Sequence, residues 1–436
     1  MTEAAAPSAA HEERAPWSTP RLIGFRFFAC YWALYLLPMA TSFLPFFNDT
    51  GDTFFRLWLP LVQWVGEHVL HLSYKITVLP AGSGDTTFDY VILLCYAAIA
   101  AGATVVWSIV DRRRREYERL EGGLRVVLRY SLGVIMLSYG GIKLIPTQFG
   151  RITADRLIQP YGESSPMGLL WTFMAFSPVY TAFCGLGESL GGILVLFRRT
   201  TALGALVCIG VLSNVVLLNF SYDVPVKLFS THLLAMAVWL VLPDARRLAD
   251  LLLFNRPVEA APIRPLGFQA RLRWPRAIAK TLFVAWAVVY PMYQAWQSLT
   301  QFNAPPAYAF AGTYEVESFM RNGMSVPTSD DRRWKHVILR TRFGARSMRD
   351  SVRIFTMERD TVKRLLTLKL WPPMAAGGDT LATQVLAYDR PDTNRLRLRG
   401  RFLGDSLDVE MRRIDRAKFL LMSRGFHWIN EIPFNR

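Results

Sequence analysis

The chain has few cysteines for its length, and none of them is arranged for redox chemistry. Its four cysteines, in 436 residues, are Cys30, Cys95, Cys184 and Cys208, and no two of them form a CxxC pair. Thiol exchange usually needs a paired, partly exposed dithiol. The sequence therefore favours four buried, small hydrophobic side chains. Because no cysteine follows residue 208, the last part of the chain does not depend on disulfides.

Motifs that would assign a chemistry are also missing. No GK[ST] follows the GSGD loop at residues 82–85, which argues against a phosphate loop; residues 85–87 instead predict a turn and a helix N-cap. His68 and His71 could share a helix face, but no third ligand lies near them, so the sequence predicts no metal site. No haem or iron–sulfur ligand set is visible. No catalytic residue can be assigned, and whether the chain is an enzyme stays open.

Acidic residues are outnumbered, with 34 Asp and Glu against 50 Lys and Arg and a formal net charge of +16. In a soluble protein this balance would suggest a nucleic-acid partner. Here basic clusters follow apolar helices, at residues 112–115, 198–199 and 246–247. The positive-inside rule explains such clusters as cytoplasmic loops. We therefore expect a lipid bilayer as the partner and no nucleic acid.

Hydrophobic residues make up 52% of the chain and are concentrated before about residue 300. Residues 1–20 are small, charged and Pro-containing, which predicts a disordered N-terminus with no removed targeting segment. Pro60 and several charges argue against a span at residues 53–72 and predict an interfacial or re-entrant helix there. About seven spans are predicted, at residues 22–47, 88–110, 124–145, 177–197, 201–219, 225–243 and 279–300. With a cytoplasmic N-terminus, the basic loops share one side and the C-terminus lies outside the cytoplasm.

Residues 305–436 change to a period of two, which is typical of strands. Leu403-Gly404 predicts a tight hairpin turn. The predicted strands cover residues 312–319, 333–340, 350–357, 363–370, 382–389, 394–402 and 405–413. Such a series suggests an up-and-down antiparallel barrel or sandwich, either hollow or filled by its own side chains.

Between residues 124 and 243, polar side chains interrupt apolar helices. The candidate ligand-binding residues are Lys143, Glu188, Asn214, Asn219, Asp223, Lys227 and His232. Six of them fall in the outer half of the predicted bundle, and Glu188 falls near the midplane. Charged groups at that depth face the bundle interior and pair, so Glu188 is expected to pair with Lys143, Lys227 or His232. Two interpretations stay open: an outward-facing polar pocket, or a structural polar clamp.

The loop at residues 146–176 follows the third predicted span. Ser164-Ser165-Pro166 predicts the start of a helix inside it. Its length and amphipathic character suit a lid, with Gln159, Tyr161 and Glu163 in its turn, although a plain packed loop fits equally well.

Three segments carry a family resemblance: SYGGIKL at residues 138–144, the run at residues 185–206, and NFSYDVPVKLFSTHLLAMAVWLVLPD at residues 219–244. With them the chain resembles the DoxX-like family of bacterial membrane proteins, named after a small subunit of a thiosulfate:quinone oxidoreductase. The resemblance implies a four-helix membrane bundle, here residues 121–245, in the bacterial inner (cytoplasmic) membrane. Lys143 and Glu188 match the family pattern. Most members have no assigned activity, and a quinone cofactor follows only as an expectation.

The predicted fold is thus a membrane helical bundle at residues 21–300, with a DoxX-like core, followed by an extracytoplasmic all-β domain at residues 301–436. Three functions are compatible with it. The bundle could bind a quinone or lipid in a redox assembly, with Lys143 and His232 on the head group and Glu188 supplying a proton. The chain could be an envelope anchor or assembly factor that presents its β domain to a membrane or periplasmic protein partner. It could also be a transporter, which the lack of an inverted repeat disfavours.

Overall fold

The computed structural model describes residues 16–42, 50–78, 82–260, 273–303, 308–371 and 383–435. The chain divides into two compact units. The helical unit comprises residues 1–149 and 166–299, and the barrel unit comprises residues 150–165 and 300–436.

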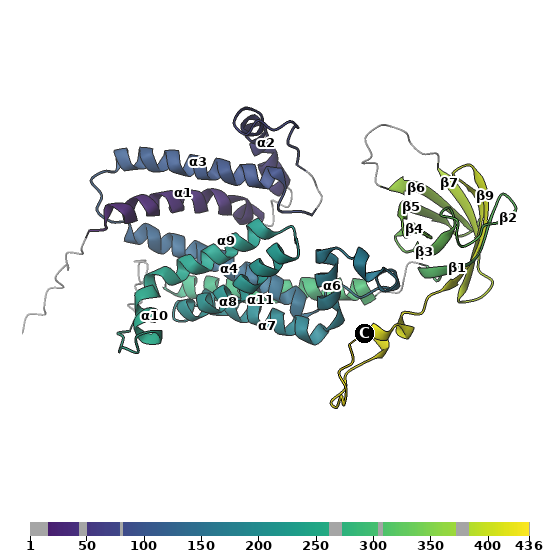
Figure 1. Cartoon of the computed structure of the whole chain (residues 1–436). Helices are drawn as coiled ribbons and strands as arrows, with labels where there is room; N and C mark the ends of the chain where they lie inside the picture. The colour runs from purple at the N-terminus through teal and green to yellow at the C-terminus, as the bar shows by residue number, and fades with distance from the viewer. Residues whose placement is uncertain are drawn as a thin grey trace, which may run out of the picture. The chain divides into compact units, whose positions relative to one another are not determined.

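The helical unit is built around a bundle in which α4 packs on α7, α7 on α8, and α8 on α9. Helices α1 and α3 lie side by side next to this bundle, and α2 packs against both of them (Figure 1). The helices are α1 (Thr19–Ser42), α2 (Thr50–His68), α3 (Thr87–Val110), α4 (Glu118–Leu144), α6 (Pro166–Phe176), α7 (Pro178–Leu196), α8 (Thr201–Ser221), α9 (Lys227–Val241), η2 (Leu242–Asp244), α10 (Ala245–Leu252) and α11 (Arg273–Asn303).

Four helical segments in the described part of the chain are long and apolar enough to cross a membrane: Thr87–Val110, Pro178–Leu196, Thr201–Ser221 and Lys227–Leu252. Over the described residues, the other three predicted spans also lie in helices, namely α1, α4 and α11. Arg125, Arg129 and Lys143 lie in α4, and Arg276 and Lys280 lie in α11. The last residues of the first predicted span, 43–47, fall outside the described residues, as do residues 1–15 of the predicted disordered N-terminus. Trp17, just after them, is buried.

Local sequence signals set the helix ends. The Thr86 side chain accepts a hydrogen bond from the Asp89 backbone N–H, and the Asp89 carboxylate accepts one from the Thr86 N–H, so a capping box starts α3. This confirms the N-cap predicted at residues 85–87. Pro166 is the first residue of α6, as the sequence predicted. Ser177 caps α7, and Pro178 follows at its first position.

Helices α4 and α7 cross at very close range because two glycines face each other. A Cβ atom on Gly185 would lie 2.7 Å from the carbonyl oxygen of Gly140 and 2.7 Å from the backbone nitrogen of Leu144. Only a residue without a side chain permits this approach. The surface of α7 that carries Gly187 and Gly191 instead contacts α8, through Val211 and Cys208. The glycines of α7 therefore serve two different helix contacts.

Three arginines, of which Arg26 and Arg129 are buried and Arg125 is half-buried, collect at one end of the helical unit. Arg26 of α1 donates to the carbonyl of Asp111 and to the Tyr117 hydroxyl. Arg129 donates to the carbonyls of Val195 and Leu196, and so satisfies the C-terminus of α7. In the same way Arg125 donates to the Leu240 carbonyl at the end of α9. The ends of α3, α7 and α9, which precede the three basic clusters, thus meet the start of α4.

The barrel unit is a closed antiparallel barrel. In the described residues the sheet order is β2-β1-β3-β4-β5-β6-β7-β8-β9, and β1 also pairs with β9, so eight strands close the barrel while β2 pairs only with β1. The strands are β1 (Gly312–Arg321), β2 (Met324–Ser325), β3 (Trp334–Leu339), β4 (Arg342–Ser347), β5 (Val352–Asp360), β6 (Leu365–Trp371), β7 (Gln384–Asp389), β8 (Arg395–Phe402) and β9 (Asp405–Arg413). The predicted hairpin is present: Leu403 and Gly404 both have positive φ and join β8 to β9.

The barrel interior is filled by its own side chains. The largest fully buried side chains include Tyr314, Phe319, Phe343 and Phe355, and leucines of β3, β6, β7 and β8 pack around them. Of the two interpretations left open by the sequence, the structure gives the filled barrel, with a cavity at one end.

From the sequence, residues 150–165 were expected in the helical domain at residues 21–300. The structure places them in the barrel unit, where they form α5 (Ala154–Leu157) and η1 (Tyr161–Glu163). Asp155 pairs with Arg340 at 3.5 Å, and Glu163 pairs with Arg346 at 3.4 Å. A segment that interrupts the helical unit in sequence is thus held by ion pairs to Arg340, which follows β3, and to Arg346 of β4, which lies 183 residues after Glu163.

Candidate functional site

The polar residues predicted to form one pocket divide into separate groups. Lys143 of α4 and Glu188 of α7 form one of them. The Lys143 Nζ atom donates to both carboxylate oxygens of Glu188, at 2.8 Å each, and both side chains are buried. Of the three partners expected for Glu188, the structure thus selects Lys143. The Lys143 ammonium also lies 5.6 Å from the ring centroid of Tyr139, a cation–π contact.

The second group lies at the start of α9. Lys227 pairs with Asp223, four residues earlier in the chain, at 2.8 Å. Asp85 joins them from the loop before α3: its carboxylate accepts hydrogen bonds from the backbone N–H groups of Lys227 and Leu228, at 2.8 and 3.0 Å. Asp85 therefore caps α9 from a distant part of the sequence. The sequence showed Asp85 only as part of a turn, because nothing local reveals a helix start 142 residues away.

The two asparagines of α8 behave differently. Asn219 is buried and donates to the Ser230 hydroxyl at 3.0 Å, so it links α8 to α9. Asn214 is exposed on the surface of the helical unit. The structure therefore does not bring Asn214 together with the other candidate residues.

His232 belongs to an aromatic group rather than to the Lys143–Glu188 pair. Its Nδ1 atom lies 2.7 Å from the Leu228 carbonyl, and its Nε2 atom lies 2.7 Å from the Tyr31 hydroxyl. A carbonyl can only accept, so in the neutral ring Nδ1 carries the proton and the Tyr31 hydroxyl donates to Nε2. The Tyr35 ring stacks on the imidazole with centroids 4.2 Å apart. Tyr31 and Tyr35 were not predicted from the sequence, because aromatic residues in an apolar helix carry no local signal of a polar partner.

Two buried polar atoms near this group have no partner among the residues that the structure describes. They are Nε1 of Trp32 and the hydroxyl of Tyr96. Trp32 contacts the His232 ring edge-on, with centroids 6.2 Å apart. A buried donor without an acceptor costs about 1–3 kcal/mol, so this region could accept a molecule with hydrogen-bond acceptors.

The predicted lid residues make short-range contacts. Gln159 accepts from Arg156 and donates to the Glu163 carbonyl at 2.8 Å. The Tyr161 side chain is exposed, and Glu163 pairs with Arg346 of β4. These contacts tie the segment to the barrel unit; closure of a lid over the bundle stays a prediction.

The barrel unit holds a cavity of about 460 Å³, called the mouth cavity below. It opens at the end of the barrel where β1, β4 and β8 end and where β3, β5 and β9 begin. Its lining residues are Phe319, Arg321, Asp331, Arg332, Trp334, Ala345, Ser347, Arg349, Ser351, Arg353, Phe402, Leu403 and Leu407. No sequence pattern predicts this cavity, because its residues come from six strands and their connections.

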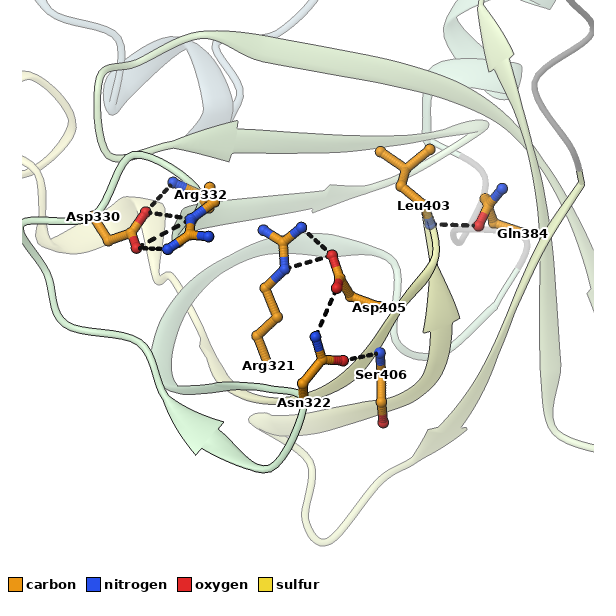
Figure 2. A network of polar contacts seen from close by, with 8 residues as sticks. All are labelled: Arg321, Asn322, Asp330, Arg332, Gln384, Leu403, Asp405 and Ser406. Carbon is orange, nitrogen blue, oxygen red and sulfur yellow. Dashed lines mark hydrogen bonds and ion pairs between the residues drawn. The ribbon is translucent and has the colours of Figure 1, made fainter.

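Ion pairs hold most of the arginines at the mouth cavity. Arg321 donates to the Asp405 carboxylate, which also accepts from the Asn322 amide at 2.7 Å (Figure 2). Figure 2 also shows Asp330 facing the Arg332 guanidinium, whose Nη2 lies 2.6 Å from a carboxylate oxygen. The hydrogen bonds from Arg332 lower the pKa of Asp330 to about 2, so this carboxylate is ionised at neutral pH.

No group of three or more His, Cys, Asp or Glu side chains is placed to hold a metal ion within the described ranges. His68 and His71 gain no further ligand within these ranges.

A comparison with known proteins then places the chain. It is 37% identical over 139 residues to the uncharacterized protein YwoB of Bacillus subtilis (strain 168), an alignment that covers 32% of this chain and 88% of YwoB. The chain belongs to the YwoB family. No family model matches it, and no solved structure matches it. Nearly all of YwoB is thus represented in about a third of this chain, which leaves two thirds of the chain outside the shared region.

Proposed function

We propose that this member of the YwoB family is a multi-pass protein of the bacterial cytoplasmic membrane whose helical unit anchors an extracytoplasmic barrel, and that the barrel meets the partner or ligand. One observation carries the proposal. The charged candidate residues of the helical unit take one another as partners, as in Lys143–Glu188 and Asp85–Lys227–Asp223, whereas the barrel unit keeps a cavity at its mouth. Charged side chains that pair with one another inside the bundle hold its helices together, and this structural role requires no ligand.

The orientation rests on the arginine-rich end of the helical unit. The segments that follow α3, α7 and α9 carry the basic clusters, and contacts of Arg26, Arg125 and Arg129 bring the neighbouring helix ends together. By the positive-inside rule, the end of the helical unit that carries these basic clusters is expected to face the cytoplasm. With α1, α3, α4, α7, α8, α9–α10 and α11 as seven spans, the barrel would lie outside the cytoplasm. The DoxX-like resemblance of residues 121–245 agrees with such a bundle.

Reporter fusions test the orientation. Alkaline phosphatase, which is active only outside the cytoplasm, should be active when fused after residue 436 and inactive when fused after residue 115. Green fluorescent protein should give the opposite pattern. Phosphatase activity at residue 115, or its absence at residue 436, would overturn the proposed topology.

Complementation tests where the function lies. In a strain that lacks the gene, a chain with Glu188→Gln and Lys143→Met together should restore the phenotype, because an uncharged pair preserves the anchor. A chain that ends at residue 303 should not restore it, although it should reach the membrane in equal amount. If the double variant fails to restore the phenotype and the chain that ends at residue 303 restores it, the function lies in the bundle.

A second function is favoured by one separate observation, the unpartnered Trp32 Nε1 and Tyr96 hydroxyl near the His232 stack. A quinone offers carbonyl acceptors and an aromatic ring, and therefore suits two orphan donors and stacked aromatic residues. In this alternative the head group would meet His232 and its tyrosines, while Lys143 stays with Glu188. Quinone should then co-purify with the wild-type protein and be lost with Trp32→Phe and Tyr96→Phe. Quinone-free lipid extracts would exclude it.

A further inference from the structure

The floor of the mouth cavity is aromatic and closed. Trp334 contacts Phe402 with ring centroids 5.0 Å apart and Phe319 with centroids 5.5 Å apart. All three side chains are buried, and Phe343 and Phe355 pack beneath them. A ligand could therefore rest on an apolar surface but could not pass into the barrel, because its interior is filled. This favours a short or flat molecule over a long-chain lipid.

The rim of the mouth cavity is cationic, but most of its charge is already neutralised. Arg321 pairs with Asp405, Arg332 pairs with Asp330, and Arg349 pairs with Asp331 at 2.7 Å. Arg353 at the start of β5 also lines the cavity. Among the residues that the structure describes, the Arg353 guanidinium has no carboxylate or hydrogen-bond partner.

The mouth cavity combines a guanidinium that has no counter-charge, that of Arg353, with an aromatic floor, and this combination favours one class of ligand. A guanidinium offers a planar fork of N–H donors that matches a carboxylate in bidentate geometry. One free positive charge balances one negative charge, which favours a carboxylate over a phosphate with nearly two. Ser347 and Ser351 add hydroxyl groups to the same wall. The volume of about 460 Å³ falls in the range of small-molecule sites.

We propose that the mouth cavity binds a small organic carboxylate with an aromatic or short apolar body, which lies on Phe319, Trp334 and Phe402 while its carboxylate pairs with Arg353. This inference rests on the proposed function, in that it names the ligand class of the barrel. It is tested separately, by binding to the purified full-length protein rather than by complementation in cells.

The experiment is calorimetric titration of the full chain in lipid nanodiscs, with empty nanodiscs as the blank. The probes are 2-naphthoate, the neutral analogue 2-naphthylmethanol, and palmitate as a long-chain carboxylate. We expect 2-naphthoate to bind with 1:1 stoichiometry and at least about tenfold more tightly than the alcohol, since a hydrogen-bonded charge pair is worth about a factor of ten or more. Equal affinity for acid and alcohol, tighter binding of palmitate, or no binding of 2-naphthoate would each overturn the inference.

Matched variants locate the site. Arg353→Gln should weaken 2-naphthoate binding about tenfold. Arg359→Gln makes the same charge change on the same strand, outside the cavity lining, and should leave the affinity unchanged. Ser351→Trp, at an exposed lining position, should block the cavity and abolish binding without changing the melting temperature. Equal losses in Arg353→Gln and Arg359→Gln would show only a general effect of net charge and would refute the site. If the titrations contradict the ligand class, the anchor proposal still stands, because it is tested by complementation in cells.

Discussion

At the scale of single residues, the Lys143–Glu188 pair shows what a sequence can and cannot specify. Charged residues in apolar helices stand out, because burial of an unpaired charge is expensive. The identity of the partner is less accessible, since Lys143, Lys227 and His232 were all compatible with Glu188 by helix depth. The choice is made by the crossing of α4 and α7 at Gly140 and Gly185, a contact between segments 45 residues apart.

Removing the charge of one member of this pair should lower the free energy of unfolding more than replacing both members with uncharged residues. Glu188→Gln leaves the Lys143 ammonium buried without its counter-charge, and we expect a loss of about 3–5 kcal/mol in the free energy of unfolding. The double variant Lys143→Met with Glu188→Gln removes the buried charge and should recover a large part of that loss. Denaturant unfolding in mixed micelles would measure both. Equal stability of the single and double variants would show that the pair contributes little.

His336 makes the stability of the barrel depend on pH. Burial, and the nearby charges of Lys335 and Arg346, lower the pKa of His336 from its ordinary value of 6.5 to about 4. Between these two values the unfolded chain binds a proton that the folded barrel does not, so stability should fall as the pH falls from about 6.5 towards 4. The melting temperature of a fragment of residues 305–436, followed by near-UV circular dichroism, should show this decline. His336→Gln should flatten it; an unchanged slope in that variant would assign the decline to other groups.

At the scale of elements, apolar runs and capping residues predict most of the fold. The Thr86 cap, the start of α6 at Pro166 and the Leu403-Gly404 hairpin followed from local chemistry. Strand β4, Arg342–Ser347, was missed because its sequence RFGARS contains a glycine and small or charged residues rather than an apolar alternation. Its partners β3 and β5 hold it in the sheet, which no local pattern reveals.

The crossing of α4 and α7 offers a test at this scale. Gly185→Ala places a methyl group 2.7 Å from backbone atoms of α4, so the helices must separate, at an expected cost of about 1–3 kcal/mol. Gly210→Ala in α8 is the matched control, because a Cβ atom there meets nothing within 4 Å. We expect it to be neutral or stabilising by about 0.5–1 kcal/mol. Thermal unfolding in detergent would compare them; equal effects would mean that the close approach does not limit stability.

At the scale of the whole molecule, the segment of residues 150–165 connects two parts of the sequence that a linear domain division keeps apart. Apolar runs place it between two predicted membrane spans, and this is why the sequence suggested a lid. Its membership of the barrel unit depends on Asp155–Arg340, Glu163–Arg346 and the hydrogen bond from Arg416 to the Ile152 carbonyl. Single charges in a loop carry no information about partners so distant in sequence.

If these contacts stabilise the barrel, a peptide of residues 150–165 should raise the melting temperature of a 305–436 fragment. Exposed ion pairs contribute only about 0.2–1 kcal/mol each, whereas complete burial of an isoleucine side chain contributes about 1.5–3 kcal/mol. Ile152 is buried and Glu163 is half-exposed. We therefore expect Ile152→Ala in the peptide to remove more of the stabilisation than Glu163→Gln. The opposite order would mean that charge, rather than apolar burial, attaches this segment to the barrel, and the attachment should then weaken in high salt.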